Sequence, residues 1–332
     1  MTQPILTRRR MIAITAALSA SALLPRGAIA GVDGPVRWSG SVLGAQGSIE
    51  IFHPDRRLAQ RLVHDALVQV RRLEQLFSLY QPDSAICTLN RSGVLAAPDP
   101  DMVTLLKASL EFAALTDGAF DPTVQPLWAL DADFFASERA SADGPSQSER
   151  AEALAKVGYR GLLVDADRVA LLKPGAGITL NGIAQGYATD RVVEMLRRAG
   201  LSTSLVNMGE IRAIGARPDG TPWRVGLDDP ERSGAITETI DLVDRAVATS
   251  AGSGFSFDSQ GRFTHLFDPA TGRSPSLYRT VSVVAPTATE ADALSTAFSA
   301  MPMDRIAEVV RLRAGVRVHA MDSAGRLKIC GA

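Results

Sequence analysis

The sequence contains few cysteines and no excess of either sign of charge. Cys87 and Cys330 are the only two cysteines, which excludes a disulfide scaffold and a zinc cluster made of cysteines. Their positions leave both pairing and free thiols open. Lys and Arg number 35 against 36 Asp and Glu, so no basic surplus is present to neutralise a phosphate backbone. Nucleic-acid binding is therefore excluded as the main role.

Long apolar runs are also absent, apart from one near the N-terminus. This run covers residues 11–24, which is shorter than the ~20 residues that a membrane-spanning helix needs. It follows an arginine cluster at 8–10 and precedes a small-x-small site at 28–30. This order of charge, apolar run and small residues is typical of a signal peptide.

The arginine cluster also resembles the twin-arginine export pattern, in which an arginine pair precedes an apolar residue in a weakly hydrophobic signal. It predicts that residues 1–30 direct export of the folded chain, that cleavage occurs near Ala30, and that the mature protein is periplasmic. An ordinary export signal with a chance additional arginine is the alternative. We expect the mature chain, residues 31–332, to form the functional domain and not to span a membrane.

The mature chain has the composition of a folded protein, with 46% apolar and 21% charged residues in the whole sequence. Apolar residues recur every three or four positions in 54–80, which predicts an amphipathic helix. We expect further helices at 101–116, 183–199, 289–301 and 304–313. Short β-type runs predict strands at 162–165, 168–172, 177–180, 204–206, 223–227, 236–243, 265–267, 280–284 and 316–321. Because helices and strands do not alternate strictly, the predicted fold class is α+β, with mixed β-sheets and packed helices.

Two segments are predicted to be irregular. Residues 118–130, GAFDPTVQPLWAL, contain too many helix and strand breakers for a regular element. Residues 131–150 are rich in Ala, Ser, Asp and Gly, so we expect a surface loop that is dispensable for chemistry.

The segment 179–191, TLNGIAQGYATDR, predicts a strand that turns sharply at Asn181-Gly182 into a helix. A helix start exposes unpaired N–H groups and the positive end of the helix dipole, so phosphate is a natural ligand there. The alternative is a tight turn whose glycines serve only packing.

The segment 285–301 places Asp292 and Thr296 on one face of a predicted helix, with Ser295 beside them. One carboxylate and two hydroxyls are hard oxygen ligands of the kind that suit Mg²⁺. The alternative is that Asp292 only complements the helix dipole.

The segment 264–275, THLFDPATGRSP, places His265 at the start of a predicted strand, where it can act as a general base. A surface or core histidine without a chemical role is the alternative. No spacing of histidines in the sequence resembles a zinc site.

These segments occur together in an order that resembles the ApbE family, the FAD:protein FMN transferases. The matching pieces are LFSLYQPDSAICTLN at 76–90, GAFDPTVQPLW at 118–128, NGIAQGYATDR at 181–191, SLVNMGEIRAIG at 204–215, AVATSAGSG at 246–254, HLFDPATGRSP at 265–275 and VVAPTATEADALST at 283–296. The resemblance implies Mg²⁺-dependent transfer of FMN from FAD to a threonine or serine hydroxyl of an acceptor flavoprotein, with release of AMP. It also implies an ApbE-like fold with the FAD and Mg²⁺ site in a cleft between two lobes.

The resemblance further implies the site residues. It places Mg²⁺ at Asp292 and Thr296, with Ser295 near and the backbone carbonyl of Gly182. His265 resembles the residue that helps to deprotonate the acceptor hydroxyl, and Asp292 acts with it in catalysis. The residues implied to hold FAD are Leu43, Tyr80, Ala119, Phe120, Asp121, Thr179, Gln185 and Phe267.

The chain departs from the family pattern at several positions. Thr179 and Gln185 stand where the family often has Asp and Lys, which removes a charged contact to FAD. The N-x-G-G pattern appears as NMGE at 207–210, which resembles the periplasmic, NosX-like members linked to nitrous oxide reductase maturation. In that subgroup the acceptor is a membrane flavoprotein. Two alternatives remain open: an FAD pyrophosphatase that forms FMN and AMP, and a non-catalytic periplasmic FAD-binding protein.

Overall fold

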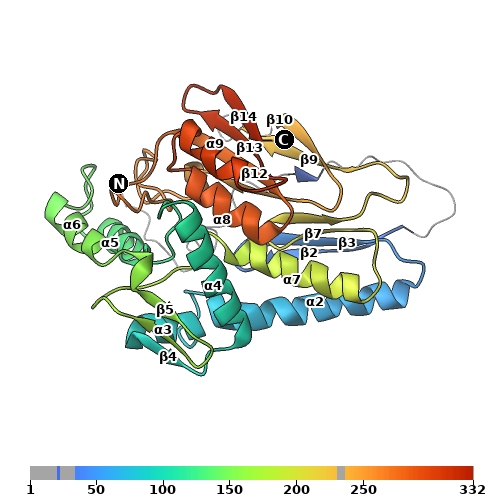
Figure 1. The fold of residues 1–332 in the computed structure, drawn as a ribbon, viewed down its shortest axis with the longest axis horizontal. Coiled ribbons are helices and arrows are strands. Elements are labelled where there is room, and N and C mark those ends of the chain that lie inside the picture. The colour runs from blue at the N-terminus through green and yellow to red at the C-terminus, as the bar shows by residue number, and fades with distance from the viewer. Residues whose placement is uncertain (1–20, 23–33, 230–235, 332) are drawn as a thin grey trace.

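The computed structural model describes residues 21–22, 34–229 and 236–331 (Figure 1). The arginine cluster and the predicted cleavage site at Ala30 lie outside these residues, and Ser21–Ala22 forms the short strand β1. No helix in the described ranges combines the length and the apolar character that a membrane crossing requires.

An eight-stranded antiparallel sheet forms the centre of the fold, in the order β14-β13-β12-β11-β8-β7-β3-β2. Its strands are β2 (Val36–Val42), β3 (Ala45–Ile51), β7 (Ser204–Asn207), β8 (Ile211–Ile214), β11 (Ala246–Ser250), β12 (Tyr278–Ala285), β13 (Arg317–Asp322) and β14 (Leu327–Gly331). The hairpin of β2 and β3 was not predicted, because glycines at 40, 44 and 47 interrupt its alternating pattern.

Helices cover one face of this sheet (Figure 1). They are α2 (Arg56–Phe77), α7 (Ala184–Arg198), α8 (Ala288–Phe298) and α9 (Met303–Arg311). Most of the apolar positions that predicted α2 are buried, among them Ala66, Val70 and Leu73. The Asp55 side chain begins this helix by accepting a hydrogen bond from the Leu58 N–H at 3.0 Å.

A second antiparallel sheet packs against the opposite face of the large sheet. It contains β1, β9 (Trp223–Asp228) and β10 (Ile236–Leu242) in the order β1-β9-β10. Trp223, Val225 and Leu242 of this sheet share an apolar cluster with residues of β7, β8, β11 and β12. The fold class α+β is therefore confirmed, with helices, the large sheet and the small sheet forming successive layers. All strand pairs among the described residues are antiparallel, so the sheets are not mixed as the sequence led us to expect.

The remaining elements lie beside these layers. They are α3 (Ala85–Ser92), α4 (Pro100–Leu115), α5 (Gln125–Ala136), α6 (Gln147–Ala155) and a sheet of β4 (Val94–Ala96), β6 (Arg168–Leu171) and β5 (Leu162–Val164). Helices α5 and α6 pack on each other and on Phe267 through a separate apolar cluster that includes Leu127 and Ala153. Cys87 and Cys330 are free thiols.

The prediction for residues 118–150 was wrong in two respects. Helix α5 begins inside the segment 118–130, and its buried residues Leu127, Asp131 and Phe134 are spaced as one helical face. Residues 131–150 are not a surface loop throughout, because the first residues of this segment belong to α5 and the last belong to α6. The signal that was overlooked is the capping box of Ser146 and Glu149, which begins α6.

Two predicted strands are also absent from the described structure. Residues 177–180 form no strand. Both backbone groups of Ile178 bond the Asn90 amide, at 2.7 and 2.8 Å, and the Thr179 N–H donates to the Pro122 carbonyl at 2.8 Å. Residues 265–267 lie in a loop where only isolated bridges form, at Ser256–Thr264 and Asp268–Arg273.

Candidate active site

One pocket gathers most of the residues that the sequence singled out. Ten of them line it: Ala119, Phe120, Asp121, Thr179, Gly182, Gln185, His265, Phe267, Asp292 and Thr296. The lining falls into two groups by the elements that carry it. We call the residues from α7, α8, β11 and their flanks, together with Glu210 from the β7–β8 turn, the helix side. Gly182, Gln185, Asp292 and Thr296 are further members. The loop side comprises residues 119–128 and 265–269.

The helix side depends on a very close approach of α7 and α8. The Gly186 N–H donates to Asp292 Oδ2 at 2.9 Å, which fixes the carboxylate at the start of α7. A Cβ at Gly186 would lie 2.3 Å from the Ala288 carbonyl oxygen, so only glycine allows this contact. The Thr296 hydroxyl lies 3.5 Å from the Gly182 carbonyl oxygen. The predicted turn therefore brings a carbonyl, a carboxylate and a hydroxyl together.

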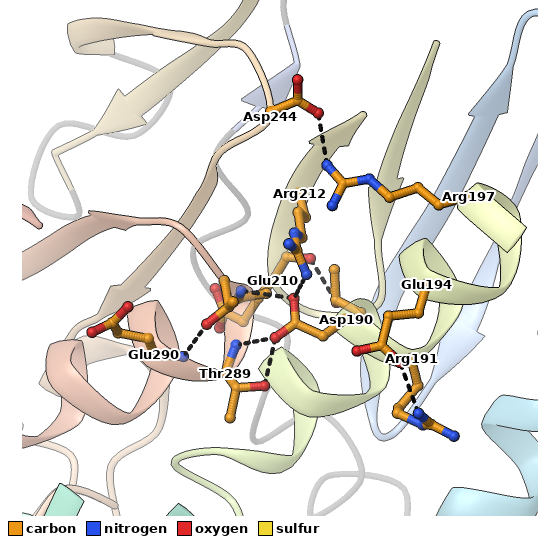
Figure 2. Close-up of polar contacts among 12 residues, drawn as sticks. Asp190, Arg191, Glu194, Arg197, Glu210, Arg212, Asp244, Thr289 and Glu290 are labelled. Atoms are coloured by element: carbon orange, nitrogen blue, oxygen red, sulfur yellow. Dashed lines mark hydrogen bonds and ion pairs between the residues drawn. The ribbon is translucent and has the colours of Figure 1, made fainter. Parts of the chain in front are cut away.

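A buried ion pair holds the two helices in this arrangement. Asp190 of α7 accepts hydrogen bonds from the backbone N–H groups of Ala288 and Thr289, both at 2.8 Å. The Thr289 hydroxyl donates to the same carboxylate at 2.6 Å, and Arg212 of β8 donates at 2.5 Å. Figure 2 shows Asp190 between the Arg212 and Thr289 side chains. The start of α8 is thus fastened to α7 and to the sheet.

Two carboxyl groups on the helix side, those of Asp292 and Glu210, have raised pKa values. Burial raises the pKa of Asp292 to about 7, with a smaller contribution from the charge of Asp190, while the Gly186 N–H opposes the rise. Burial and the charge of Asp292 raise the pKa of Glu210 well above its usual value. Sequence reasoning missed Glu210 as a site residue, although its place in NMGE marked it as a departure from the family pattern.

The donor set on the helix side fits a divalent cation. The described residues lining the pocket include the carboxyl groups of Asp292 and Glu210 but no Lys or Arg. In the described ranges no group of three His, Cys, Asp or Glu side chains has the arrangement of a metal site. A cation bound by Asp292, Thr296 and the Gly182 carbonyl would need further oxygens from water or substrate. Mg²⁺ is typically held in this way.

Ser295 lies behind this donor set and does not line the pocket. Its hydroxyl is 2.8 Å from the hydroxyl of Ser250, which does line the pocket and is also 3.5 Å from the Thr296 hydroxyl. Ser295 also donates to the Asp292 carbonyl at 3.0 Å. The structure therefore places Ser250 on the wall of the pocket, and Ser295, the residue implied by the resemblance, one hydrogen bond away from it.

Leu43 and Tyr80 also lie next to the pocket without lining it. The Gln185 side chain donates to the Leu43 carbonyl at 3.3 Å, so Gln185 links α7 to the β2–β3 turn. Burial raises the pKa of the Tyr80 hydroxyl, and a hydrogen bond with the side chain of Asn181 opposes that rise. Asn181 is a lining residue that sequence reasoning named only as part of a turn.

Asp121 on the loop side is held by its own surroundings. One carboxylate oxygen accepts from the Thr123 N–H at 2.7 Å and from its hydroxyl at 2.6 Å, and the other accepts from the Tyr159 N–H at 2.9 Å. Burial raises its pKa despite these bonds. Asp121 therefore shapes the segment that carries Ala119 and Phe120, and its carboxylate oxygens already have donors.

His265 is positioned as a neutral base. Its Nδ1 atom lies 3.2 Å from the Phe255 carbonyl oxygen, which only accepts hydrogen bonds, so the proton must be on Nδ1. Burial lowers the pKa of the imidazole, which keeps the ring uncharged at neutral pH. Nε2 then carries the free lone pair. The ring lines the same pocket as Asp292.

Comparisons with known proteins identify the family to which the chain is similar. The model of the ApbE family matches residues 43–320. The FAD:protein FMN transferase of Escherichia coli K12 is 32% identical over 298 residues, covering 86% of this chain and 84% of the relative. That of Treponema pallidum is 31% identical over 282 residues and covers 76% of each chain.

Solved structures show the same fold. The ApbE protein of Thermotoga maritima superposes with a TM-score of 0.80 at 30% identity, covering 89% of this chain and 97% of that one. The flavin transferase ApbE of Vibrio cholerae superposes with a TM-score of 0.77 at 25% identity, covering 90% and 97% of the two chains.

Proposed function

The chain belongs to the ApbE family and is a flavin transferase of that family, and we propose that it transfers FMN from FAD to a threonine or serine hydroxyl of an acceptor flavoprotein in a Mg²⁺-dependent reaction. The observation that carries this proposal is the shared pocket of His265, Asp292, Thr296 and Gly182. It combines a neutral base with a donor set for a cation.

The charges of the pocket support the need for a metal. The FAD pyrophosphate is anionic, whereas the described lining residues offer carboxyl groups and no Lys or Arg. Asp292, Thr296 and the Gly182 carbonyl would hold Mg²⁺. When bound, the ion neutralises pyrophosphate charge and stabilises the leaving phosphate.

The proposed step is a displacement at the FMN phosphorus of FAD. The acceptor hydroxyl oxygen forms a bond to that phosphorus, and the bond from phosphorus to the bridging pyrophosphate oxygen breaks, so AMP leaves. His265 takes the hydroxyl proton on Nε2, because Nδ1 is already protonated and bonded to Phe255. Residues of the loop side and Gln185 orient the flavin nucleotide by packing and polar contact.

The test is to incubate the protein with FAD, Mg²⁺ and an acceptor flavoprotein domain. In-gel flavin fluorescence and mass spectrometry should find FMN esterified to an acceptor threonine or serine, with one AMP released per adduct. An Asp292→Ala variant should give no adduct. Free FMN and AMP without an adduct would replace the proposal with FAD hydrolysis, and FAD binding without any product would replace it with a carrier role.

We also propose a periplasmic location, supported by the arginine cluster and apolar run within residues 1–30. The NMGE segment supports a NosX-like role, with a membrane flavoprotein of nitrous oxide respiration as acceptor. Fractionation of cells producing the full chain tests the first proposal, since a cytoplasmic uncleaved product would contradict it. A location of the gene far from any denitrification locus would count against the second.

A further inference from the structure

Residues 131–150 are packed against the loop that carries His265. We call residues 255–274 the histidine loop. Gly144 approaches it so closely that a Cβ there would lie 2.3 Å from the Phe263 ring. The Arg262 side chain donates to the Ala142 carbonyl, which adds a second contact between the two segments.

Arg150 is the centre of this packing. Its guanidinium bonds the Asp131 carboxylate, with the shorter distance 2.6 Å, and Arg150 and Asp131 are only 8% and 1% exposed. The same guanidinium donates to the Gly272 carbonyl at 2.8 Å. It also lies over the Phe263 ring, 5.8 Å from its centre. A single buried cation from α6 therefore contacts α5 and two points of the histidine loop.

These two points lie on either side of the catalytic segment. Phe263 precedes His265 by two residues, and Gly272 follows Phe267 by five. Inside the loop, the Thr264 N–H donates to the Ser274 hydroxyl at 2.8 Å, and the His265 N–H donates to the Phe255 carbonyl at 3.2 Å. Because these internal bonds are local, they set the shape of the loop but do not attach it to the rest of the pocket.

Neither the sequence nor the proposed chemistry assigns a role to this pair. A planar guanidinium can bond a carboxylate and a carbonyl at once, which an ammonium group does poorly. Asp131 pairs with Arg150 and orients it in a buried position, where an unpaired charge is costly.

We propose that Asp131 and Arg150 are positioning residues that fix the histidine loop, and with it His265 and Phe267, against the pocket. The role rests on the proposed transfer reaction, because it is His265 that the loop presents to the acceptor hydroxyl. Asp131 and Arg150 then contribute to the reaction, although they lie in a segment that composition led us to expect to be dispensable.

The test compares Arg150→Met with Arg139→Met in the full chain. Arg139 lies in the same segment, but its ion pair with Glu149 is exposed and does not touch the histidine loop. For Arg150→Met we expect tryptic cleavage at Arg262 or Arg273 to rise about tenfold below the unfolding temperature, because local opening becomes easier. We expect kcat for transfer to fall about tenfold or more through misplacement of His265.

Two further measurements separate positioning from general destabilisation. Mg²⁺ affinity, measured by calorimetry on the protein without flavin, should stay within about twofold, because its donors lie on the helix side. Arg150→Lys should restore only part of kcat, whereas Arg139→Met should match the parent in all measurements.

Unchanged cleavage and unchanged kcat in Arg150→Met would overturn the proposal, as would a parallel loss of Mg²⁺ affinity. If the parent itself formed no adduct, the transfer function would fail, while the cleavage and Mg²⁺ measurements would still decide whether Arg150 holds the loop.

Discussion

The two sides of the pocket are held in place by different kinds of interaction. On the helix side, functional groups come from α7, α8 and β11, and the backbone itself does much of the positioning, as in the bond from the Gly186 N–H to Asp292. On the loop side, His265 and Phe267 lie in a segment with isolated bridges only, and side chains from α5 and α6 hold it. Each side has one buried Asp–Arg pair, which fastens two helices in one case and a loop in the other. The proposed metal donors thus lie on helices packed on the large sheet, and the proposed base lies in a loop.

Removing the proposed metal donor of the helix side should have the largest effect. Asp292→Ala should abolish transfer, a loss of about 10³-fold or more, because the charge of the pyrophosphate is then uncompensated. Some FAD binding should remain, since the loop side is untouched. Steady-state kinetics and FAD titration measure both. Glu290→Gln on the same helix is the control, because Glu290 pairs with Arg313 and does not line the pocket. Full transfer by Asp292→Ala would refute the metal assignment.

Removing the base tests the loop side. His265→Ala should lower kcat by about 10²-fold and leave Mg²⁺ affinity unchanged. The parent should lose activity on the acid side as His265 becomes protonated. Because burial lowers the pKa of this imidazole, the midpoint of that loss should lie below the ordinary value near 6.5. The pH dependence of kcat at saturating Mg²⁺ measures it. An acid limb that persists in His265→Ala would assign the titration to another group.

Removing the ion pair of Arg212 with Asp190 tests whether the helix side depends on one buried ion pair, as we propose that the histidine loop depends on Arg150. Arg212→Met leaves the buried Asp190 carboxylate without its cation and should cost about 3 kcal/mol of unfolding free energy. Because Asp190 anchors the start of α8, Mg²⁺ affinity should also fall, by about tenfold. Denaturant unfolding and calorimetry check the two effects. Retained Mg²⁺ affinity would show that α8 keeps its place without this pair.

The smallest expected change comes from one added methyl group. Gly186→Ala places a Cβ against the Ala288 carbonyl and should destabilise the fold by about 1–3 kcal/mol through overpacking. Gly93→Ala, where nothing lies within 4 Å of the added atom but φ is +74°, provides a comparison that carries backbone strain alone. Thermal unfolding measures both. Equal losses of thermal stability in the two variants would mean that α7 and α8 can move apart to accommodate the added methyl group at little cost.

The helix side was the more predictable of the two. The sequence predicted helices at 183–199 and 289–301, where α7 and α8 lie, and residues four apart on a helix share a face, so Asp292 and Thr296 could be paired from the sequence. The loop side offered no comparable helical pattern. The contact of Arg150 with Gly272 joins residues 122 positions apart, and no local pattern encodes it. Glu210 was missed for a related reason, since its acidity depends on burial and on Asp292, which lies on another element.

The two hydrogen bonds between the Asn90 side chain and the Ile178 backbone affect how much of the neighbouring segment remains accessible from the pocket. A neighbouring strand would have covered several residues of the segment that enters α7, including Thr179. The Asn90 side-chain amide instead bonds the N–H and the carbonyl of Ile178 alone, at 2.7 and 2.8 Å, in the way that a neighbouring strand would bond one residue. The Asn90 amide thereby anchors Ile178, the Thr179 N–H donates to the Pro122 carbonyl at 2.8 Å, and Thr179 still lines the pocket. Asn90→Asp would lose one of the two hydrogen bonds, because a carboxylate cannot donate to the Ile178 carbonyl.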